Sequence, residues 1–408
     1  MVYSYIGGNM EENKKQKSFS TSETVLLVLM ASVVCYFIGH ILVFDKNDAN
    51  TIKYDPFIEE FVQNYNYVIE NYYENVNRQD LINSAISGML ESLDDPYSTY
   101  IDEESKDNFN ITLNGSYQGI GVQIIKDETT GYILVTGVFK DSPASKAGLK
   151  AGDYIISANS IMAKDVDAAG FSKYVRESKD RVFKMHIKRE NEELDIEIIR
   201  NNVVISSVSS EVFERNNKKI GYIYIGIFAS NTDEQFKEEL NKLKEQNVES
   251  IIIDVRDNTG GHLTAVNGIL DLFIDSSHIK YQFYQNGVTT KLRGSSKNVE
   301  RISITLLANE NSASASEVLI AGLRENLGAK LFGKKTYGKG TVQELVNLSD
   351  GNQYKITVRK WLTPLGNWVN DTKGIEPDFE VELDAKYLET HDDSDDTQLQ
   401  AVLDYLAK

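Results

Sequence analysis

A strand, a polar turn and a helix are predicted between residues 302 and 323, and they constrain the fold more than any other feature. Residues 302–307 are apolar and partly β-branched, which is typical of a buried strand. Val318, Leu319 and Leu323 then recur at helical spacing. The small residues of the turn therefore lie at a helix N-terminus, where unpaired backbone N–H groups stabilise an oxyanion.

Ser314 lies in this turn, within the segment 312–317, which reads Ser-Ala-Ser-Ala-Ser-Glu. In a structural interpretation, Ser314 and Glu317 form a capping box, in which each side chain bonds to the other residue's backbone. In a functional interpretation, one of these serines is a nucleophile. The alanines beside each hydroxyl favour this second interpretation, because small side chains let a substrate backbone approach closely.

Lys339 lies between two glycines, in a predicted turn between the apolar segments 330–333 and 341–346. It is either a surface lysine of a hairpin or the base that an attacking serine needs. Lysine takes a proton only when neutral, so its pKa must fall by roughly 3 units from about 10.4, which desolvation can supply. The functional interpretation therefore predicts that Lys339 is buried beside Ser314 and has no carboxylate partner.

Together these motifs resemble the carboxyl-terminal processing peptidases, or tail-specific proteases, a family of serine peptidases with a Ser/Lys dyad and a PDZ domain. The similarity covers nearly everything after Tyr54, with several motifs in the expected order. The resemblance implies that Ser314 is the nucleophile, that Lys339 is its base and that Gln343 supports Lys339. It also implies an acyl-enzyme mechanism without a metal or an organic cofactor.

A second strand and turn are predicted at residues 250–261, where an apolar run ends in Arg-Asp-Asn-Thr-Gly-Gly. The glycine pair is either a structural turn or part of an oxyanion hole. The resemblance implies the second, with backbone N–H groups donated by Gly260 or Gly261 and by Ala315. Thr259 stands where the family usually has a proline.

His262 follows the glycine pair and is the only histidine near the proposed site in the sequence. It is an alternative base to Lys339, which the family pattern does not favour. The other four histidines show no metal-binding spacing.

Residues 111–203 contain short predicted strands and one or two helices, and the segments 142–153 and 155–159 resemble a PDZ domain of the processing-peptidase type. In PDZ domains a glycine-bearing loop binds the C-terminal carboxylate of a peptide, which adds to the sheet as a strand. The matching positions are Gly119, Ile120, Gly121 and Val122. Arg176 precedes the predicted last strand, 182–189, and is either a sensor of bound peptide or a plain surface arginine.

The N-terminal region predicts a membrane anchor. Residues 24–44 are uncharged and are long enough to span a bilayer as a helix. A cleaved signal peptide is the alternative, but no small-residue cleavage site follows before Asp45. Lys14, Lys15 and Lys17 precede the run, which predicts a cytoplasmic N-terminus and an extracytoplasmic remainder. Cys35, the single cysteine, then lies within the membrane.

Other elements are predicted from periodicity alone. Helices are expected at 57–72, 81–93, 232–244, 263–274 and 398–406, and strands at 219–228 and 354–361. The acidic stretch 392–396 is interpreted as a solvated loop.

The predicted fold class is a multidomain α+β or α/β protein with a transmembrane helix, a helical segment, a PDZ domain and, by resemblance, a mixed α/β, crotonase-like peptidase core. The boundaries are a cytoplasmic tail at 1–23, an anchor at 24–44, a linker at 45–54, a helical region at 55–110, the PDZ domain at 111–203 and the core at 204–408. The formal charge of −18 argues against nucleic acid as a partner.

The predicted function is a membrane-anchored serine endopeptidase whose protein or peptide substrates have free C-termini and are cut near them. The alternative is a PDZ scaffold or holdase that binds exposed C-termini and cuts nothing. The joint presence of Ser314, Lys339 and Gln343 favours the enzyme, because a binding protein does not need these residues. Assembly into a homo-oligomer through the N-terminal helices is a further hypothesis.

Overall fold

The computed structural model describes residues 55–408, so the predicted tail, anchor and linker, with Cys35, lie outside the described residues. Within residues 55–408, no helix is both long enough and apolar enough to cross a bilayer. The chain divides into two compact units between Leu81 and Ile82.

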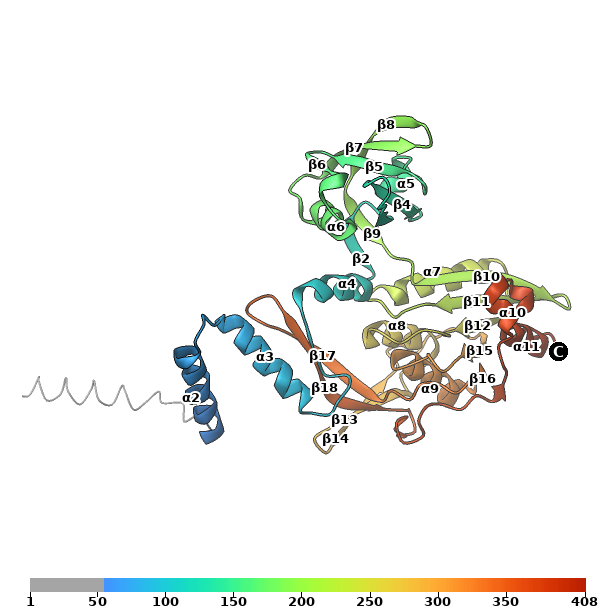
Figure 1. Ribbon diagram of the computed structural model, residues 1–408. Coiled ribbons are helices and arrows are strands. Elements are labelled where there is room, and N and C mark those ends of the chain that lie inside the picture. The colour runs from blue at the N-terminus through green and yellow to red at the C-terminus, as the bar shows by residue number, and fades with distance from the viewer. Residues whose placement is uncertain (1–54) are drawn as a thin grey trace, which may run out of the picture. The chain divides into compact units, whose positions relative to one another are not determined.

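Two helices open the described chain, α2 (Pro56–Asn71) and α3 (Arg78–Glu91), and they confirm the helices predicted there (Figure 1). Asp55 caps α2 by accepting a hydrogen bond from the Phe57 N–H, and Pro56 occupies the first turn, where its missing N–H costs nothing. Helix α2 buries none of its side chains, and Phe57 is 77% exposed.

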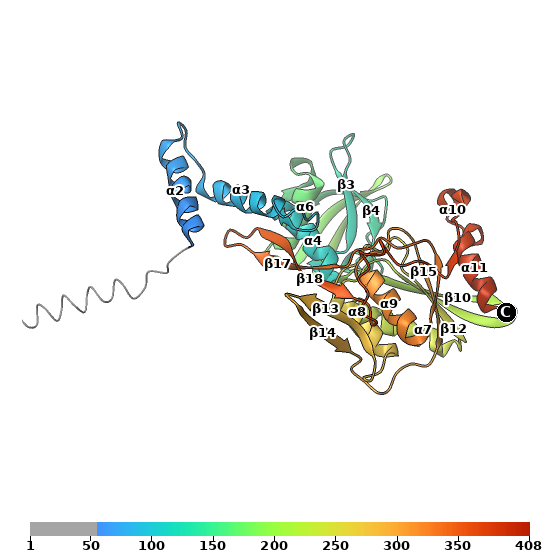
Figure 2. The same ribbon diagram turned by 90° about the horizontal axis from the view of Figure 1, so that it is seen from below.

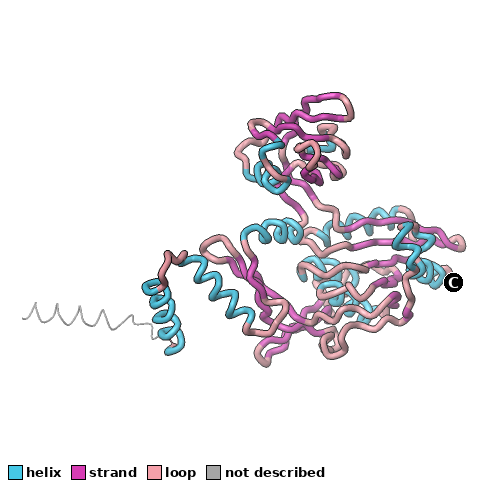
Figure 3. Tube along the Cα trace, viewed as in Figure 1, coloured by secondary structure: helices cyan, strands magenta, loops and turns pink. Residues whose placement is uncertain are grey.

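A small domain follows the short helix α4 (Glu103–Asn114). Its strands are β2 (Ser116–Gly119), β3 (Val122–Lys126), β4 (Ile133–Val138), β5 (Tyr154–Ala158), β6 (Ile161–Met162), β7 (Val182–Arg189), β8 (Glu192–Ile199) and β9 (Asn201–Val204). Its helices are α5 (Pro143–Lys146) and α6 (Ala168–Glu177), with a 3₁₀ turn, η1 (Ala163–Asp165), between β6 and α6. Figure 3 shows the strands in magenta and the helices in cyan.

The small domain's sheet has the order β3-β4-β5-β7-β8, with β6 paired to β5. Phe183, Met185 and Ile187 alternate along β7 and are buried with Phe171 of α6, so one face of the sheet forms the core. The prediction that 182–189 is the last strand of the domain was wrong, because β8 and β9 follow it. Strand β8 pairs along all of β7, and β9 returns antiparallel to β2.

The large domain is built on a six-stranded sheet in the order β10-β11-β12-β15-β16-β19. The strands are β10 (Val208–Arg215), β11 (Lys218–Ile225), β12 (Ser250–Asp254), β15 (Ser303–Ala308), β16 (Lys330–Gly333) and β19 (Phe379–Glu380). Neighbours from β11 to β19 run parallel, whereas β10 and β11 are antiparallel.

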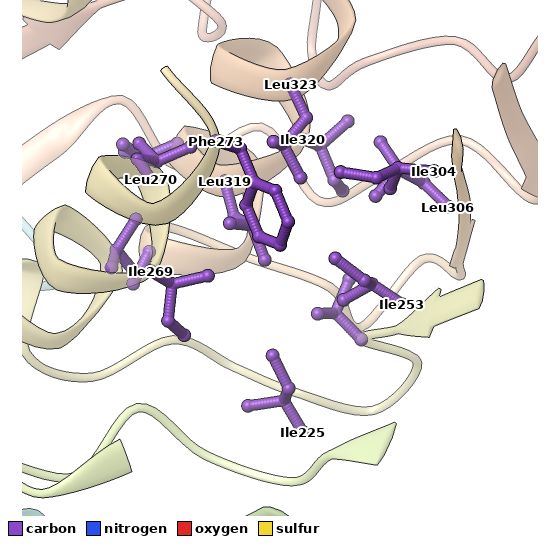
Figure 4. Packing of buried hydrophobic residues seen from close by; sticks show 14 of the residues in the cluster. Ile225, Ile253, Ile269, Leu270, Phe273, Ile304, Leu306, Leu319, Ile320 and Leu323 are labelled. Carbon is purple, nitrogen blue, oxygen red and sulfur yellow. The ribbon is translucent and has the colours of Figure 1, made fainter. Parts of the chain in front are cut away.

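Helices cover both faces of this sheet, which explains why the three central residues of β12 are all isoleucines. Ile251 and Ile253 face α7 (Thr232–Glu245), α8 (Leu263–Phe273) and α9 (Ala315–Leu327). Ile252 faces the opposite side, where α11 (Thr397–Leu406) packs. Figure 4 shows the Phe273 ring of α8 pointing between side chains from α9 and from the sheet, and α8 and α9 lie side by side in Figures 1 and 2.

A second sheet of the large domain joins segments that are far apart in the sequence. It contains β1 (Thr99–Ile101), β18 (Gln353–Leu362), β13 (Ile279–Gln285), β14 (Val288–Arg293) and β17 (Thr341–Asn347). Thr99 pairs with Lys355, so the segment after α3 is part of the large domain.

The acidic stretch 392–396 was predicted to be solvated, and this prediction was wrong for its last residue. Asp396 is 1% exposed and forms a buried salt bridge with Arg256 at 2.7 Å. It also caps α11 by accepting the Leu399 N–H at 2.9 Å. The preceding residues form a 3₁₀ turn, η2 (Asp393–Asp395), after the short helix α10 (Ala385–Thr390).

Candidate active site

A cavity of about 580 Å³ brings together most of the residues predicted for the active site. The turns after β12 and β15, the loop between β16 and β17, and strands β17 and β18 all contribute to its wall. Among the predicted residues, those that line it are Gly260, Gly261, Ser314, Lys339 and Gln343. Ala315, the remaining predicted residue of this site, is fully buried as the first residue of α9.

Ser314 differs from its two neighbouring serines in what its hydroxyl contacts. Ser312 Oγ donates to the Val255 carbonyl at 2.7 Å, and Ser316 Oγ donates to the Asn258 carbonyl at 2.8 Å. Ser314 Oγ instead faces the Glu317 N–H in the capping box, and within residues 55–408 its own O–H donates to no acceptor. Its backbone has φ +55° and ψ −111°, which is strained for a residue with a Cβ and is typical of functional turns.

Glu317 ties the turn of Ser314 to the loop of Lys339. Its side chain is fully buried, and Oε2 accepts the N–H of Ser314 at 2.9 Å and that of Lys339 at 2.8 Å. Oε1 accepts the Gly338 N–H at 2.7 Å and the Thr336 hydroxyl at 2.6 Å. Burial raises the pKa of Glu317, and these hydrogen bonds lower it in part. The capping interpretation of Glu317 was therefore right but incomplete, since three of its four bonds reach other parts of the site.

The backbone of the Lys339 loop is held from several sides. Trp361 Nε1 donates to the Lys339 carbonyl at 2.8 Å, and Trp368 Nε1 donates to the Gly340 carbonyl at 2.9 Å. The Gly340 N–H donates to the Asn370 side chain. These bonds fix the Cα of Lys339, so only its side chain remains free to change position.

The Lys339 amine is partly buried, and no carboxylate of the described chain lies within ion-pair distance of it. Burial lowers its pKa and the charge of Lys355 lowers it further, whereas the carboxylates of Asp95 and Glu317 raise it. The net direction is downward, which favours the neutral amine that a general base requires. In residues 55–408, however, no hydrogen bond joins Nζ to Ser314, and Nζ instead lies 4.4 Å from the centre of the Tyr97 ring.

Gln343 lines the cavity, but its amide is turned toward two threonines. Its Nε2 donates to Thr341 Oγ1 and to Thr357 Oγ1, each at 3.0 Å. The structure therefore does not bring this amide into contact with Lys339, and the supporting role expected of Gln343 stays a prediction.

The glycine pair lies directly against the turn of Ser314. A Cβ placed on Gly260 would lie 3.0 Å from both the Ala313 carbonyl oxygen and the Ser314 Cβ. The Gly260 N–H donates to Asn258 Oδ1 at 2.9 Å, so it is already engaged. The N–H groups of Gly261 and Ala315 have no acceptor within residues 55–408. Of the two glycines considered, Gly261 is thus the one with a free donor.

If Gly261 donates to an oxyanion, as the sequence predicts, its replacement by alanine should lower kcat for peptide cleavage by about 10²-fold or more, the usual effect of losing one such donor. Its φ is +138°, and an added Cβ would lie 2.2 Å from the Phe228 carbonyl oxygen, so the turn must shift. Steady-state kinetics with a fluorogenic peptide measures the effect. Gly287→Ala is the matched control, because that glycine also has positive φ but has open space around it. Equal kcat values for the two variants would contradict the assignment.

His262 lines the same cavity, but its environment disfavours the role of base. Burial lowers its pKa, and its ring donates a hydrogen bond to the Leu113 carbonyl. Its Nε2 is buried and has no partner within residues 55–408. No hydrogen bond connects it to Ser314 in this part of the chain.

A second cavity, of about 230 Å³, lies in the small domain between β3 and α6. Three of the predicted peptide-binding residues, Gly119, Ile120 and Val122, line it together with Arg176 of α6. Gly121 is buried between them, and its carbonyl accepts the Phe139 N–H at 3.0 Å. Strand β3 is an edge strand of its sheet, so a peptide can pair with it beside α6.

The segment 94–98, Asp-Asp-Pro-Tyr-Ser, was not among the predicted site residues, yet its Tyr97 ring lies beside the Lys339 amine. The strand that follows it, β1, pairs with residues 353–355 of β18, and no local pattern in the sequence indicates a partner some 255 residues away. Within residues 55–408, no group of three or more His, Cys, Asp or Glu residues is arranged to hold a metal ion.

Known families match three segments of the chain. Residues 219–381 match "Peptidase family S41", residues 118–199 match "PDZ domain", and residues 43–105 match "Activating protease CtpB N-terminal domain".

Individual relatives cover more of the chain. The carboxy-terminal processing protease CtpB of Bacillus subtilis (strain 168) is 35% identical over 80% of this chain and 68% of its own length. The carboxy-terminal processing protease CtpA of the same strain is 32% identical over 91% of this chain and 78% of its own length. A solved structure, the photosystem II D1 C-terminal processing protease, has a TM-score of 0.44 and 24% identity and covers 79% of this chain and 86% of that chain.

Proposed function

Because the chain belongs to peptidase family S41, as a carboxy-terminal processing serine protease with a PDZ domain, we propose that it cuts proteins near their C-termini through a dyad of Ser314 and Lys339. The observation that carries this proposal is one cavity that contains a serine whose O–H has no acceptor in the described chain and a lysine with a lowered pKa. A neutral amine and a free hydroxyl are the two groups that nucleophilic acyl transfer needs.

In the proposed reaction, the neutral Lys339 amine takes the proton of Ser314 as Oγ attacks the scissile carbonyl. The N–H groups of Gly261 and Ala315 stabilise the tetrahedral oxyanion. The Lys339 ammonium then returns a proton to the leaving amine, and the C-terminal fragment departs. Water, activated by the same amine, hydrolyses the ester on Ser314 and restores the enzyme.

The dyad requires a change in the Lys339 side chain, because Nζ rests on Tyr97 and not on the Ser314 hydroxyl. The held backbone of the loop supports a rotation of the side chain alone as that change. We include Gln343 in the proposal as the residue that orients the amine after this rotation, with its bonds to Thr341 and Thr357 as the resting arrangement.

Substrate C-termini are proposed to bind in the cavity of the PDZ domain, at Gly119, Ile120, Gly121 and Val122, beside Arg176. The free edge of β3 and the apolar groove next to α6 support this mode of binding. A peptide that ends in a carboxylamide should bind more weakly than the free acid, and equal binding in isothermal titration calorimetry would refute carboxylate recognition.

We also propose that residues 24–44 anchor the protein with its catalytic part outside the cytoplasm, supported by their uncharged sequence and the preceding lysines. Protease treatment of intact cells should then digest a C-terminal tag, and a tag that stays protected until lysis would refute this orientation.

The exposed apolar residues of α2 support assembly with a second copy. Light scattering with and without residues 55–95 tests this, and unchanged mass would refute it.

The test of the proposed activity is incubation of the purified full chain with an unfolded protein, beside Ser314→Ala. Mass spectrometry should detect C-terminal fragments with the parent chain only. Equal and negligible cleavage by both proteins would favour a holdase that binds C-termini without cutting them.

The pH dependence of kcat/KM should show one acid limb that belongs to Lys339. The base works when neutral, and burial lowers its pKa, so the rate should rise with pH to a plateau with a midpoint below about 10.4, the usual lysine value. Initial rates between pH 5 and 10 on a peptide without titratable groups measure this, with Ser314→Ala as the blank. A rate that is independent of pH would contradict the role of Lys339.

A further inference from the structure

The segment 94–98 is fastened to the active-site sheet by several bonds. It connects α3 to β1, and β1 pairs antiparallel with β18. The Thr357 N–H of β18 donates to Ser98 Oγ at 3.0 Å, and Ser98 Oγ donates to Asp95 Oδ2 at 2.6 Å. The Tyr97 N–H donates to Asp95 Oδ1 at 3.1 Å. These contacts fix the backbone of Tyr97 relative to the cavity.

The ring of Tyr97 lies against the catalytic amine. Lys339 Nζ is 4.4 Å from the ring centre, within the range in which the negative face of an aromatic ring attracts a cation. Burial and a hydrogen bond with the Tyr337 hydroxyl raise the pKa of Tyr97 to about 12, so the ring is a neutral phenol under working conditions. Tyr97 therefore offers the amine a π face, and not a charge.

The other charged groups around Lys339 do not account for this position of the amine. Asp95 and Glu317 attract the ammonium electrostatically, but neither lies within ion-pair distance. Lys355 of β18 repels it. Glu317 is already occupied by backbone N–H groups. Tyr97, in contrast, makes a direct contact with Nζ.

We propose that Tyr97 is a positioning residue for the general base: its ring holds the protonated Lys339 side chain away from Ser314 and thereby sets the pH at which the base becomes available. This inference rests on the proposed Ser/Lys dyad. When the amine loses its proton to solvent, the cation–π attraction disappears, and the neutral side chain is free to rotate toward the Ser314 hydroxyl. The resting position and the catalytic position of Lys339 are thus linked by one proton.

The direction in which Tyr97 shifts the pKa of Lys339 depends on which protonation state of the amine the ring stabilises. The ring favours the ammonium, so its presence raises the pKa of Lys339 above the value that burial and Lys355 alone would give. Removing the ring should lower that pKa, and the acid limb of kcat/KM should move to lower pH. A cation–π contact at a partly exposed site corresponds to a shift of about 0.4 to 0.7 pH unit.

The experiment compares three variants of the full chain with the parent by pH profiles of kcat/KM. Tyr97→Leu keeps an apolar side chain without a π face, and the acid limb of its profile should move down by about 0.4 to 0.7 pH unit. Tyr97→Phe keeps the aromatic π face and loses only the hydroxyl. The acid limb of its kcat/KM profile should therefore stay at the pH of the parent. Tyr97→Trp has an aromatic face that attracts a cation more strongly, so the acid limb of its kcat/KM profile should move to higher pH.

The proposal would be overturned if the acid limb of the kcat/KM profile stayed in place in Tyr97→Leu or moved to higher pH. A merely structural role for Tyr97 would lower the rate equally at every pH and leave the midpoint unchanged. If Tyr97→Leu does not fold, as judged by circular dichroism, the opposite shift expected for Tyr97→Trp decides the question by itself.

A second measurement does not depend on catalysis. Competitive acylation of lysine amines, read by peptide mass spectrometry in a Ser314→Ala background, reports the pKa of Lys339 directly. That pKa should fall in Tyr97→Leu and not in Tyr97→Phe, and equal values would overturn the proposal. Full activity of Ser314→Ala would instead refute the proposed dyad, so the two failures are distinguishable.

Discussion

Replacing Lys339 by methionine is expected to reduce kcat/KM for an unfolded protein by at least about 10³-fold, because Ser314, the proposed nucleophile, loses its proposed base. Methionine keeps much of the length and apolar character of the lysine stem. The bonds that hold this loop, to Trp361, Trp368 and Glu317, all use backbone atoms and survive the substitution. The loss should therefore fall on kcat, with little change in the folded structure.

Lys335→Met is the matched control, since Lys335 belongs to the same loop but forms a surface ion pair with Glu376. Its kcat/KM should stay within about twofold of the parent value, because exposed ion pairs contribute little. The double variant Ser314→Ala/Lys339→Met should lose no more activity than either single variant, since residues that act as one unit are not additive. Substantial activity in Lys339→Met would remove the amine from the mechanism and reopen the assignment to His262.

Replacing Arg256 by methionine is expected to destabilise the large domain by about 3–5 kcal/mol, since it leaves buried carboxylates without their cation. Arg256 donates to Asp254 Oδ2 at 2.7 Å and to both carboxylate oxygens of Asp396, at 3.0 and 2.7 Å. Asp254 is 0% exposed. The guanidinium thus joins β12, which leads into the turn of Gly261, to the N-terminus of α11.

Urea unfolding followed by tryptophan fluorescence measures this loss, because both tryptophans, Trp361 and Trp368, lie in the large domain. Arg215→Met is the control, since Arg215 also reaches α11, through Asp404, but forms its pair at the surface. That variant should lose no more than about 1 kcal/mol. Equal losses for the two arginines would show that burial of the pair does not matter.

Local sequence patterns were sufficient for the elements that carry the site. The apolar run and helical spacing predicted β15 and α9, and the structure has them at Ser303–Ala308 and Ala315–Leu327. The turn containing Lys339 is likewise found between β16 and β17. These predictions succeeded because strand and helix periodicity and helix capping depend on residues only a few positions apart.

Contacts between distant segments could not be predicted in this way. No periodicity links Tyr97 to Lys339, and no charge pattern distinguishes the buried Asp396 from its solvated neighbours. The choice between Gly260 and Gly261 depended on one side-chain bond from Asn258, which sets which N–H is free. Glu317 was recognised as a local cap, but its bonds to the Lys339 loop arise only when β16 and α9 pack together.

The carboxylate of Glu317 has a consequence for how this protease can be switched. Because it receives N–H groups from both segments, pulling one backbone away from the other would break hydrogen bonds to a buried charge, at about 1.5–3 kcal/mol each. A rotation of the Lys339 side chain about its own χ angles breaks none of these hydrogen bonds to Glu317. An activating signal that reaches this site therefore costs least free energy if it changes only the rotamer of Lys339. The Ser314 turn and the Lys339 loop then stay joined through Glu317.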